Sequence, residues 1–270
     1  MSLKRRKVEQ GEMNYLISTS DLMAGLLFVF IIALAIQIIS FNEEEERTVQ
    51  AKEEARQAHS KAVKAERKAE DLQNRLAGND VARRDLLHRM QSKLAKEGLY
   101  VKVDPSNGVL RLPEESITFD TGKATLEERY ISRLQTLRTA LSDELKCFHS
   151  KSAALTECEK INPYSHTLDA VFIEGHTDNQ PFGGDTTGKR NRTLSTERAN
   201  TVYTILLDDN SVLREFLNPN GQNLFSLSGY GAERPVPGHF HQKPTNDPVN
   251  RRIELRFLMS TPSLEFSNNG

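Results

Sequence analysis

The sequence lacks tryptophan, has only two cysteines and carries no excess of either charge. With 36 Lys and Arg against 37 Asp and Glu, no overall basic field points to a nucleic-acid partner. Two cysteines exclude a disulfide-rich scaffold. Apolar residues make up 37% of the 270 residues and the mean hydropathy is −0.55, which excludes a polytopic membrane protein. The apolar residues are concentrated in one early run and in the C-terminal half, with a charged stretch between them.

One apolar run is long enough to cross a membrane. Residues 22–39 read LMAGLLFVFIIALAIQII, with Gln37 as the only strongly polar member. A bilayer core requires about 20 apolar residues in a helix, and this length is reached when the count begins at Leu16. We therefore predict a single transmembrane helix over residues 16–40.

The charges that flank this run indicate its orientation. The basic segment 4–7 (KRRK) precedes it and the acidic segment 43–46 (EEEE) follows it. The positive-inside rule then predicts a cytoplasmic segment at 1–15 and places the remainder of the chain outside. A cleaved signal peptide is the alternative, since residues 33–35 (ALA) resemble a cleavage site. The run continues past that triplet and is longer than the roughly 7–15 residues of a signal core, which favours an uncleaved anchor.

Asp21 is the first candidate functional residue. A carboxylate at the edge of a membrane helix is costly, so its default interpretation is a functional group. Desolvation would raise the pKa of the Asp21 carboxyl and allow a protonation cycle near neutral pH. The alternative is that Asp21 only caps the helix, beside the Ser-Thr-Ser segment at 18–20.

The segment 41–98 is dense in Glu, Lys, Arg and Ala and predicts a charged helical stalk. Small apolar residues recur in it at alternating spacings of 4 and 3, which is a heptad seam: Ala51, Ala55, Ala58, Ala62, Ala65, Ala69, Leu72 and Leu76. Two such helices approach closely but bury little area, so the anchor and the outer domain would have to help hold the pair. A single solvated helix is the alternative.

Residues 78–80 (Gly-Asn-Asp) interrupt the seam and predict a break, after which Asn79 or Asp80 caps a new helix. An apolar stripe marks that helix: Leu86, Leu87, Met90 and Leu94. Gly98 predicts its C-terminal end.

Beyond Leu99, strands alternate with helices and predict a small α/β domain over 99–262, followed by a tail at 263–270. Strands are predicted near 100–103, at 109–112 after an Asn107-Gly108 turn, and at 171–173, 224–227 and 253–257; helices are predicted at 124–145 and 194–217. The first helix has an apolar stripe of Leu126, Tyr130, Leu134, Leu137 and Leu141.

Cys147 and Cys158 lie in the segment CFHSKSAALTEC. In an oxidising compartment these residues predict a disulfide that closes a local loop. A zinc site with His149 and His166 is the alternative, although the spacing fits no strong metal pattern.

Four segments together resemble the peptidoglycan-binding domain shared by OmpA, Pal and MotB. They are 119–122 (FDTG), 174–179 (EGHTDN), 194–199 (LSTERA) and 250–254 (NRRIE). The resemblance covers about residues 99–260, and the segment 229–231 (GYG) with Pro235 fits the family's penultimate loop. Each motif alone is weak, but four in order at sensible spacing are specific.

The resemblance implies a site for the diaminopimelate of peptidoglycan stem peptides, which carries both a carboxylate and an ammonium group. Asp178 would face the ammonium group, and Arg198 would clamp the carboxylate with its planar fork. The resemblance adds further pocket residues: Phe119, Asp120, Thr177, Asn179, Leu194 and Arg252. Asp120 and Arg252 have the alternative role of tying strand ends together. His176 is expected to be a packed, hydrogen-bonded residue; since no convincing nucleophile accompanies it, we predict no catalytic residue, metal or cofactor.

The segment 20–23 (SDLM), followed by an apolar run, resembles the transmembrane helix of MotB, whose Asp is the proton carrier. This layout implies a bacterial inner-membrane protein with a periplasmic C-terminal domain, present as a dimer inside a ring of MotA-like subunits. The sequence departs from flagellar MotB, because the Trp that usually precedes the Asp is missing and the Ala-seamed stalk and the Cys loop are unusual. These departures resemble the MotB-like (ZorB-like) subunits of Zorya anti-phage systems, which implies a ZorA-like ring partner.

Three alternatives remain open. The first is a flagellar-type or other MotB-like stator subunit. The second is a passive peptidoglycan tether, which would tolerate Asp21→Asn. The third is a TolR- or ExbD-like energiser, which the motifs at 174–198 disfavour because such proteins usually lack an OmpA-like domain.

Overall fold

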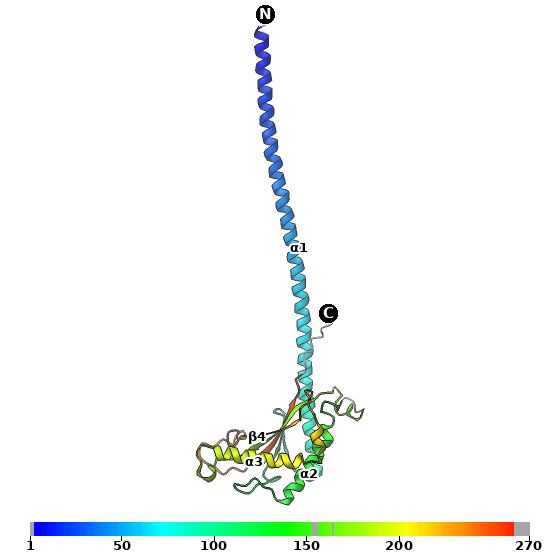
Figure 1. Cartoon of the computed structure of the whole chain (residues 1–270), viewed down its shortest axis with the longest axis vertical. Helices are drawn as coiled ribbons and strands as arrows, with labels where there is room; N and C mark the ends of the chain where they lie inside the picture. Colours follow the sequence, from blue (N-terminus) through cyan, green and yellow to red (C-terminus); the bar gives the residue numbers. More distant parts are fainter. Residues whose placement is uncertain (1–2, 153–155, 164, 262–270) are drawn as a thin grey trace. The chain divides into compact units, whose positions relative to one another are not determined.

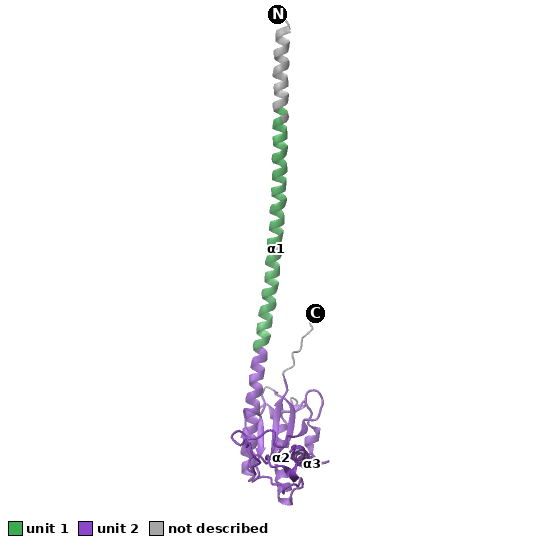
Figure 2. Cartoon of the chain, turned by 90° about the vertical axis from the view of Figure 1, so that its left-hand side faces the viewer, with its two compact units in different colours: residues 1–70 green, residues 71–270 purple. Residues whose placement is uncertain are grey.

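The computed structural model describes residues 3–152, 156–163 and 165–261, with side chains described for residue 20 and from residue 22 onward within these ranges. The chain divides into two compact units, Met1–Glu70 and Asp71–Gly270 (Figure 2). The side chain of Asp21 and the predicted tail at 263–270 lie outside the described residues.

Helix α1 spans Leu3–Lys96 and contains the predicted membrane segment and the predicted stalk. From Leu22 onward it is long and apolar enough to cross a membrane. The large apolar side chains between Leu22 and Ile39 are all exposed, as expected for a surface that would face lipid. The helical conformation predicted for residues 16–40 and for the stalk is confirmed.

The break predicted at residues 78–80 is wrong, because α1 continues through them without interruption. Asn79 is buried rather than capping a helix: its Nδ2 donates to the carbonyl oxygen of Ser260 at 2.9 Å, and its Oδ1 lies 2.7 Å from His166 Nδ1. Gly78 faces the same imidazole, and a Cβ added there would lie 2.9 Å from His166 Cε1. These polar and small residues therefore serve tertiary contacts, not a helix end.

The last turns of α1 are part of the core of the second unit. The predicted stripe of Leu86, Leu87, Met90 and Leu94 is fully buried there. The helix ends as predicted near Gly98, which adopts φ +74°, and Leu99 N–H donates to the Leu94 carbonyl at 2.9 Å. The domain start predicted at residue 99 therefore falls inside the compact unit, which begins at Asp71.

The described residues of the second unit form one sheet of five strands: β1 (Lys102–Asp104), β2 (Val109–Leu112), β3 (Leu168–His176), β4 (Phe225–Gly229) and β5 (Arg252–Met259). Their order is β1-β2-β5-β3-β4. The β3–β4 pair is parallel and the other pairs are antiparallel. The α/β architecture predicted from the sequence is confirmed (Figure 1).

Helix α2 (Glu128–Leu145) begins four residues later than predicted. The carbonyl oxygens just before it are engaged by side chains of the next helix: Arg198 Nε donates to Lys123 at 3.0 Å and Thr201 Oγ1 to Ala124 at 2.7 Å. That segment is therefore held outside the helix. The predicted stripe is buried at Tyr130, Leu134, Leu137 and Leu141, and Leu126 packs on the core from outside the helix.

Helix α3 (Lys189–Leu206) begins five residues earlier than predicted and does not extend to residue 217. Asp185 accepts the Arg190 N–H at 2.8 Å, which satisfies a donor in the first turn. The pKa of Asp185 is lowered to about 2, first by a hydrogen bond from the Thr187 hydroxyl and then by hydrogen bonds from the backbone N–H groups of Arg190 and Thr187. After the helix, Asp208 Oδ1 accepts the Asn210 N–H in a turn, and a short 3-10 helix, η4 (Val212–Glu215), follows.

Two further 3-10 turns are η2 (Thr156–Cys158) and η3 (Phe182–Gly184). Cys158 at the end of η2 is bonded to Cys147, so the predicted disulfide is confirmed. The zinc alternative is wrong because both thiols are consumed in that bond. His149 instead stacks on Phe216, with ring centroids 4.7 Å apart.

Replacing Cys147 and Cys158 together with alanine is expected to lower the free energy of unfolding by about 2–3 kcal/mol, because the bridge closes a short loop in the unfolded chain. This corresponds to a melting temperature about 5–10 °C lower for a unit of this size. Thermal melts of the full chain in detergent would measure the change. A reductant should lower the melting temperature of the wild type and leave the double variant unchanged; an equal response of both would contradict the prediction.

Candidate functional site

A cavity of about 400 Å³ opens among the segment before α2, the loop after β3 and the first turns of α3. Five of the predicted site residues line it: Phe119, Thr177, Asp178, Leu194 and Arg198. The other lining residues are Glu114, Thr121, Gly122, Gln180, Pro181, Phe182, Gly183, Asn191, Asn246 and Arg251. The wall thus combines aromatic and aliphatic surface with two acidic and two basic side chains.

Asp178 provides the buried carboxylate of this wall. It lies two residues after the end of β3 at His176, where the chain leaves the sheet. Its Oδ2 accepts from Arg251 Nη1 at 2.8 Å, and its Oδ1 accepts the Gln180 N–H at 3.2 Å. The carboxylate is 9% exposed as a residue, so its charge acts in a partly desolvated site.

Arg198 provides a buried guanidinium of the same cavity. It projects from α3, donates through Nε to the Lys123 carbonyl and through Nη2 to the Asp120 carbonyl, and lies over the Phe119 ring at 5.1 Å from its centroid. Burial, with the nearby Arg251, lowers the pKa of this guanidinium. The side chain is therefore fixed in orientation before any ligand is bound.

Arg251 is a wall residue that the sequence reasoning missed. Its guanidinium joins two carboxylates, since Nη1 donates to Asp178 and Nη2 donates to Glu114 Oε2 at 2.9 Å; it also donates to Asn246. The motif at 250–254 contains two adjacent arginines, and the sequence alone favoured Arg252. Adjacent residues at a strand start point in opposite directions, so only one of the pair can face the cavity.

Three predicted site residues lie outside the lining of this cavity. Asp120 pairs with Lys123 at 2.9 Å on the surface and contributes only its carbonyl to Arg198. Asn179 holds a neighbouring loop through its amide. Arg252 is buried among the sheet residues: its Nε lies 2.7 Å from Glu254 Oε1 on the same strand, and its Nη2 donates to the Arg234 carbonyl at 3.0 Å.

Arg252 belongs to a buried ionic cluster on the sheet. Its carboxylates are Glu174 and Glu254; its bases are Arg111, Arg252, Arg256 and His176. His176 is 1% exposed and stacks on Tyr230, so its expected packing is confirmed. The hydrogen bonding expected of His176 is not confirmed, because neither ring nitrogen makes a hydrogen bond. Its Nε2 lies 3.5 Å from Glu254 Oε2.

The two glutamates and His176 lie close enough to hold a metal ion, but the charges oppose it. Arg256 donates to both oxygens of Glu174 at 2.9 and 2.8 Å, and Arg252 occupies Glu254. A metal ion placed there would have to displace these arginines from the two carboxylates, because the arginine charges already balance them. Burial lowers the pKa of His176, which favours the neutral ring.

The chain is 26% identical over 174 residues to motility protein B of Bacillus subtilis, covering 64% of this chain and 50% of that protein. It therefore spans about half the length of that curated relative. No protein-family profile matches the chain.

Solved structures that are similar to part of this chain include a MotB-like protein from Desulfovibrio vulgaris, with 19% identity, a TM-score of 0.46, and coverage of 67% of this chain and 96% of that chain. The cell wall anchor of the type VI secretion system of Pseudomonas aeruginosa has 18% identity and a TM-score of 0.40, covering 64% and 97%. The periplasmic domain of Helicobacter pylori MotB has 19% identity and a TM-score of 0.37, covering 59% and 79%.

Proposed function

We propose that this chain is a MotB-like subunit of an ion-driven motor of the bacterial inner membrane, anchored to peptidoglycan through the cavity around Asp178 and Arg198. The observation that carries the anchor is that one cavity is lined by a carboxylate and a guanidinium that are both held in place by hydrogen bonds. The proposal gives the protein no catalytic role.

The cavity suits a ligand that carries an ammonium and a carboxylate group a few bonds apart. Asp178 and Glu114 also accept from Arg251, and the ammonium would share their carboxylate oxygens with it; Arg198 offers the fork that binds a carboxylate. Phe119 and Leu194 supply apolar surface for the methylene chain between them. The diaminopimelate of a peptidoglycan stem peptide has this chemistry.

The motor part of the proposal rests on the sequence of the apolar helix. Asp21 lies at its start, and a carboxylate there is the group that an ion would neutralise. Two copies of the chain would lie inside a ring of MotA-like subunits, N-termini in the cytoplasm, with the heptad seam of α1 joining the pair. Protonation of Asp21 would change its contacts with the ring, which turns against the anchored domain.

The departures from flagellar MotB favour a ZorB-like subunit with a ZorA-like ring, serving Zorya-type anti-phage defence. The missing Trp before Asp21, the Ala-seamed stalk and the Cys147–Cys158 loop support this choice. A flagellar-type stator subunit and a passive peptidoglycan tether are the competing functions.

Binding to isolated peptidoglycan sacculi tests the anchor. Arg198→Ala and Asp178→Asn are expected to weaken binding of the full chain by roughly 10- to 100-fold, because each removes a charged hydrogen-bond partner of the ligand. Co-sedimentation in detergent would measure the bound fraction. Arg192→Ala is the matched control, since Arg192 lies on the same helix and pairs with Glu233 at the surface. Equal binding by all variants would refute the assigned cavity.

Phage plating tests the motor. Cells that carry the native operon with Asp21→Asn are expected to lose protection at matched expression, because an amide cannot take up and release a proton. Protection that survives the substitution would identify Asp21 as a cap and the protein as a tether. No protection in either strain, against a broad phage panel, would instead favour a flagellar-type stator.

A further inference from the structure

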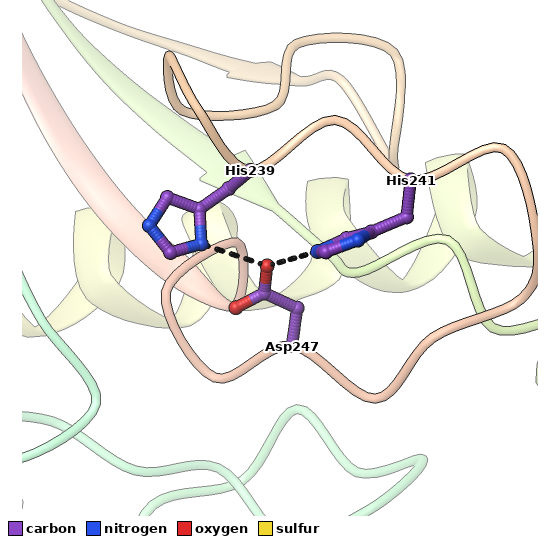
Figure 3. Close-up of side chains that lie close together, drawn as sticks. All are labelled: His239, His241 and Asp247. Carbon is purple, nitrogen blue, oxygen red and sulfur yellow. Dashed lines mark hydrogen bonds and ion pairs between the residues drawn. The ribbon is translucent and has the colours of Figure 1, made fainter.

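A second cluster of side chains lies in the loop between β4 and β5, and the proposed function does not use it. His239, His241 and Asp247 converge there, and both imidazoles point at one carboxylate oxygen (Figure 3). His239 Nδ1 lies 3.0 Å and His241 Nε2 lies 2.7 Å from Asp247 Oδ2. The Asp247 side chain is 7% exposed, while those of His239 and His241 are 40% and 34% exposed.

The backbone of this loop is held by two asparagine side chains. Asn250 Nδ2 donates to the His239 carbonyl at 2.8 Å, and its Oδ1 accepts the Val236 N–H at 2.9 Å. Asn179 Nδ2 donates to the His241 carbonyl at 2.7 Å. The Val249 N–H donates to Asp247 Oδ1 at 2.9 Å, which leaves Oδ2 directed at the imidazoles. Asn250 Nδ2 also donates to Asp247 Oδ2 at 3.2 Å, so the asparagine that holds the backbone of the loop also orients the carboxylate oxygen that faces the imidazoles.

We propose that His239 Nδ1, His241 Nε2 and Asp247 Oδ2 form a binding site for a divalent transition-metal ion of the Zn²⁺ type. Two imidazoles and one carboxylate are ligands that Zn²⁺ accepts in tetrahedral geometry, with water completing the shell. Bonds of about 2.0–2.1 Å place neighbouring ligand atoms roughly 3.3 Å apart. The observed separations of 3.0 and 2.7 Å require only a small widening for an ion to enter.

The charge environment distinguishes this cluster from the buried one on the sheet. Among the described residues, no lysine or arginine is ion-paired with Asp247, whereas arginines occupy the carboxylates around His176. The buried carboxylate thus keeps its charge for an ion, and the exposed imidazole edges leave a path from solvent. Imidazole ligands favour Zn²⁺ over Ca²⁺ or Mg²⁺, which prefer oxygen.

Zinc titration of the full chain tests the site, using protein without a histidine tag in detergent. Isothermal titration calorimetry should show about one saturable equivalent in the wild type. His239→Gln and His241→Gln are expected to weaken zinc binding by at least about 100-fold, since loss of even an outer partner of a ligand costs 10–100-fold. Glutamine retains a donor to Asp247, so these variants are designed to keep the loop folded.

His59→Ala is the matched control, because His59 lies exposed on α1 and belongs to neither cluster. It should bind zinc as the wild type does. Zinc should also raise the melting temperature of the wild type and of His59→Ala but not of His241→Gln. Absence of saturable binding in the wild type, or unchanged affinity in both glutamine variants, would overturn the proposal. These readouts are independent of peptidoglycan binding and of motor activity.

Discussion

Glu254→Gln is expected to lower the free energy of unfolding by about 3–5 kcal/mol, the range for removing one partner of a buried ion pair. Glu254 is 2% exposed, and its Oε1 accepts from Arg252 Nε and from Arg111 Nε, each at 2.7 Å. Glutamine keeps the shape of the side chain but removes the charge. Arg252 then remains buried beside Arg111 without its counter-charge.

The pH dependence of this effect follows from the pKa of the carboxyl. Burial would raise the pKa of Glu254, but the nearby imidazole of His176 and the charge and hydrogen bond of Arg252 hold it far below its ordinary value of 4.5. A depressed folded-state pKa contributes stability above the unfolded pKa, and that stability is lost as pH falls through the folded value. The difference between wild type and Glu254→Gln should therefore be constant above about pH 6 and shrink in acid.

Urea unfolding of the full chain would measure the change, followed by tyrosine fluorescence because the chain has no tryptophan. Glu233→Gln is the control, since it breaks the exposed pair with Arg192 at 2.8 Å. Exposed pairs contribute about 0.2–1 kcal/mol, so this variant should be nearly neutral. Similar losses in the two variants would show that the buried cluster is not the stabilising element.

Periodicity was sufficient for the parts of the fold that bury one continuous face. Leu86, Met90 and Leu94 repeat at helical spacing, and they pack in the core because nothing competes with that face. The Asn107-Gly108 turn was equally local: Gly108 adopts φ +68°, which the turn between β1 and β2 requires.

The helix boundaries that were predicted wrongly depend on tertiary contacts. Gly78 and Asn79 resemble a helix end, yet α1 continues through them. Their residue types instead serve His166, which is distant in sequence: Gly78 leaves room for its imidazole, and Asn79 Oδ1 lies 2.7 Å from its Nδ1. The start of α2 was predicted too early for a related reason, since side chains of α3 engage the carbonyls that would have extended it. Such partners are invisible in a sequence window.

The candidate site shows the same division. The motifs identified Asp178 and Arg198, whose residue types match the proposed ligand and which both line the cavity. The motifs did not distinguish Arg251 from Arg252, because the two are adjacent and have the same side chain. Which of them faces the cavity depends on the residue at which β5 begins. Asn179 was assigned to the pocket by resemblance, whereas its amide holds the backbone of His241 and Lys243.

Gly175→Ala is expected to lower the free energy of unfolding by about 3 kcal/mol, at the upper end for overpacking. Gly175 lies in β3 where α3 crosses it, and a Cβ there would lie 2.0 Å from the Ser195 carbonyl oxygen. The obstacle is backbone, so no rotamer change relieves it. Its φ lies outside the left-handed region, which means that space rather than conformation requires glycine here.

Gly184→Ala separates these two causes. Gly184 has φ +77° and nothing within 4 Å of an added Cβ, so alanine should cost only the conformational strain of about 1–2 kcal/mol. Gly175→Ala acts on the cavity as well, because Ser195 lies between Leu194 and Arg198 on the helix that must shift. Urea unfolding should therefore give a lower free energy of unfolding for Gly175→Ala than for Gly184→Ala. Binding of the folded fraction to sacculi should weaken only in Gly175→Ala. The reverse order of stability would mean that α3 yields easily and does not fix Arg198.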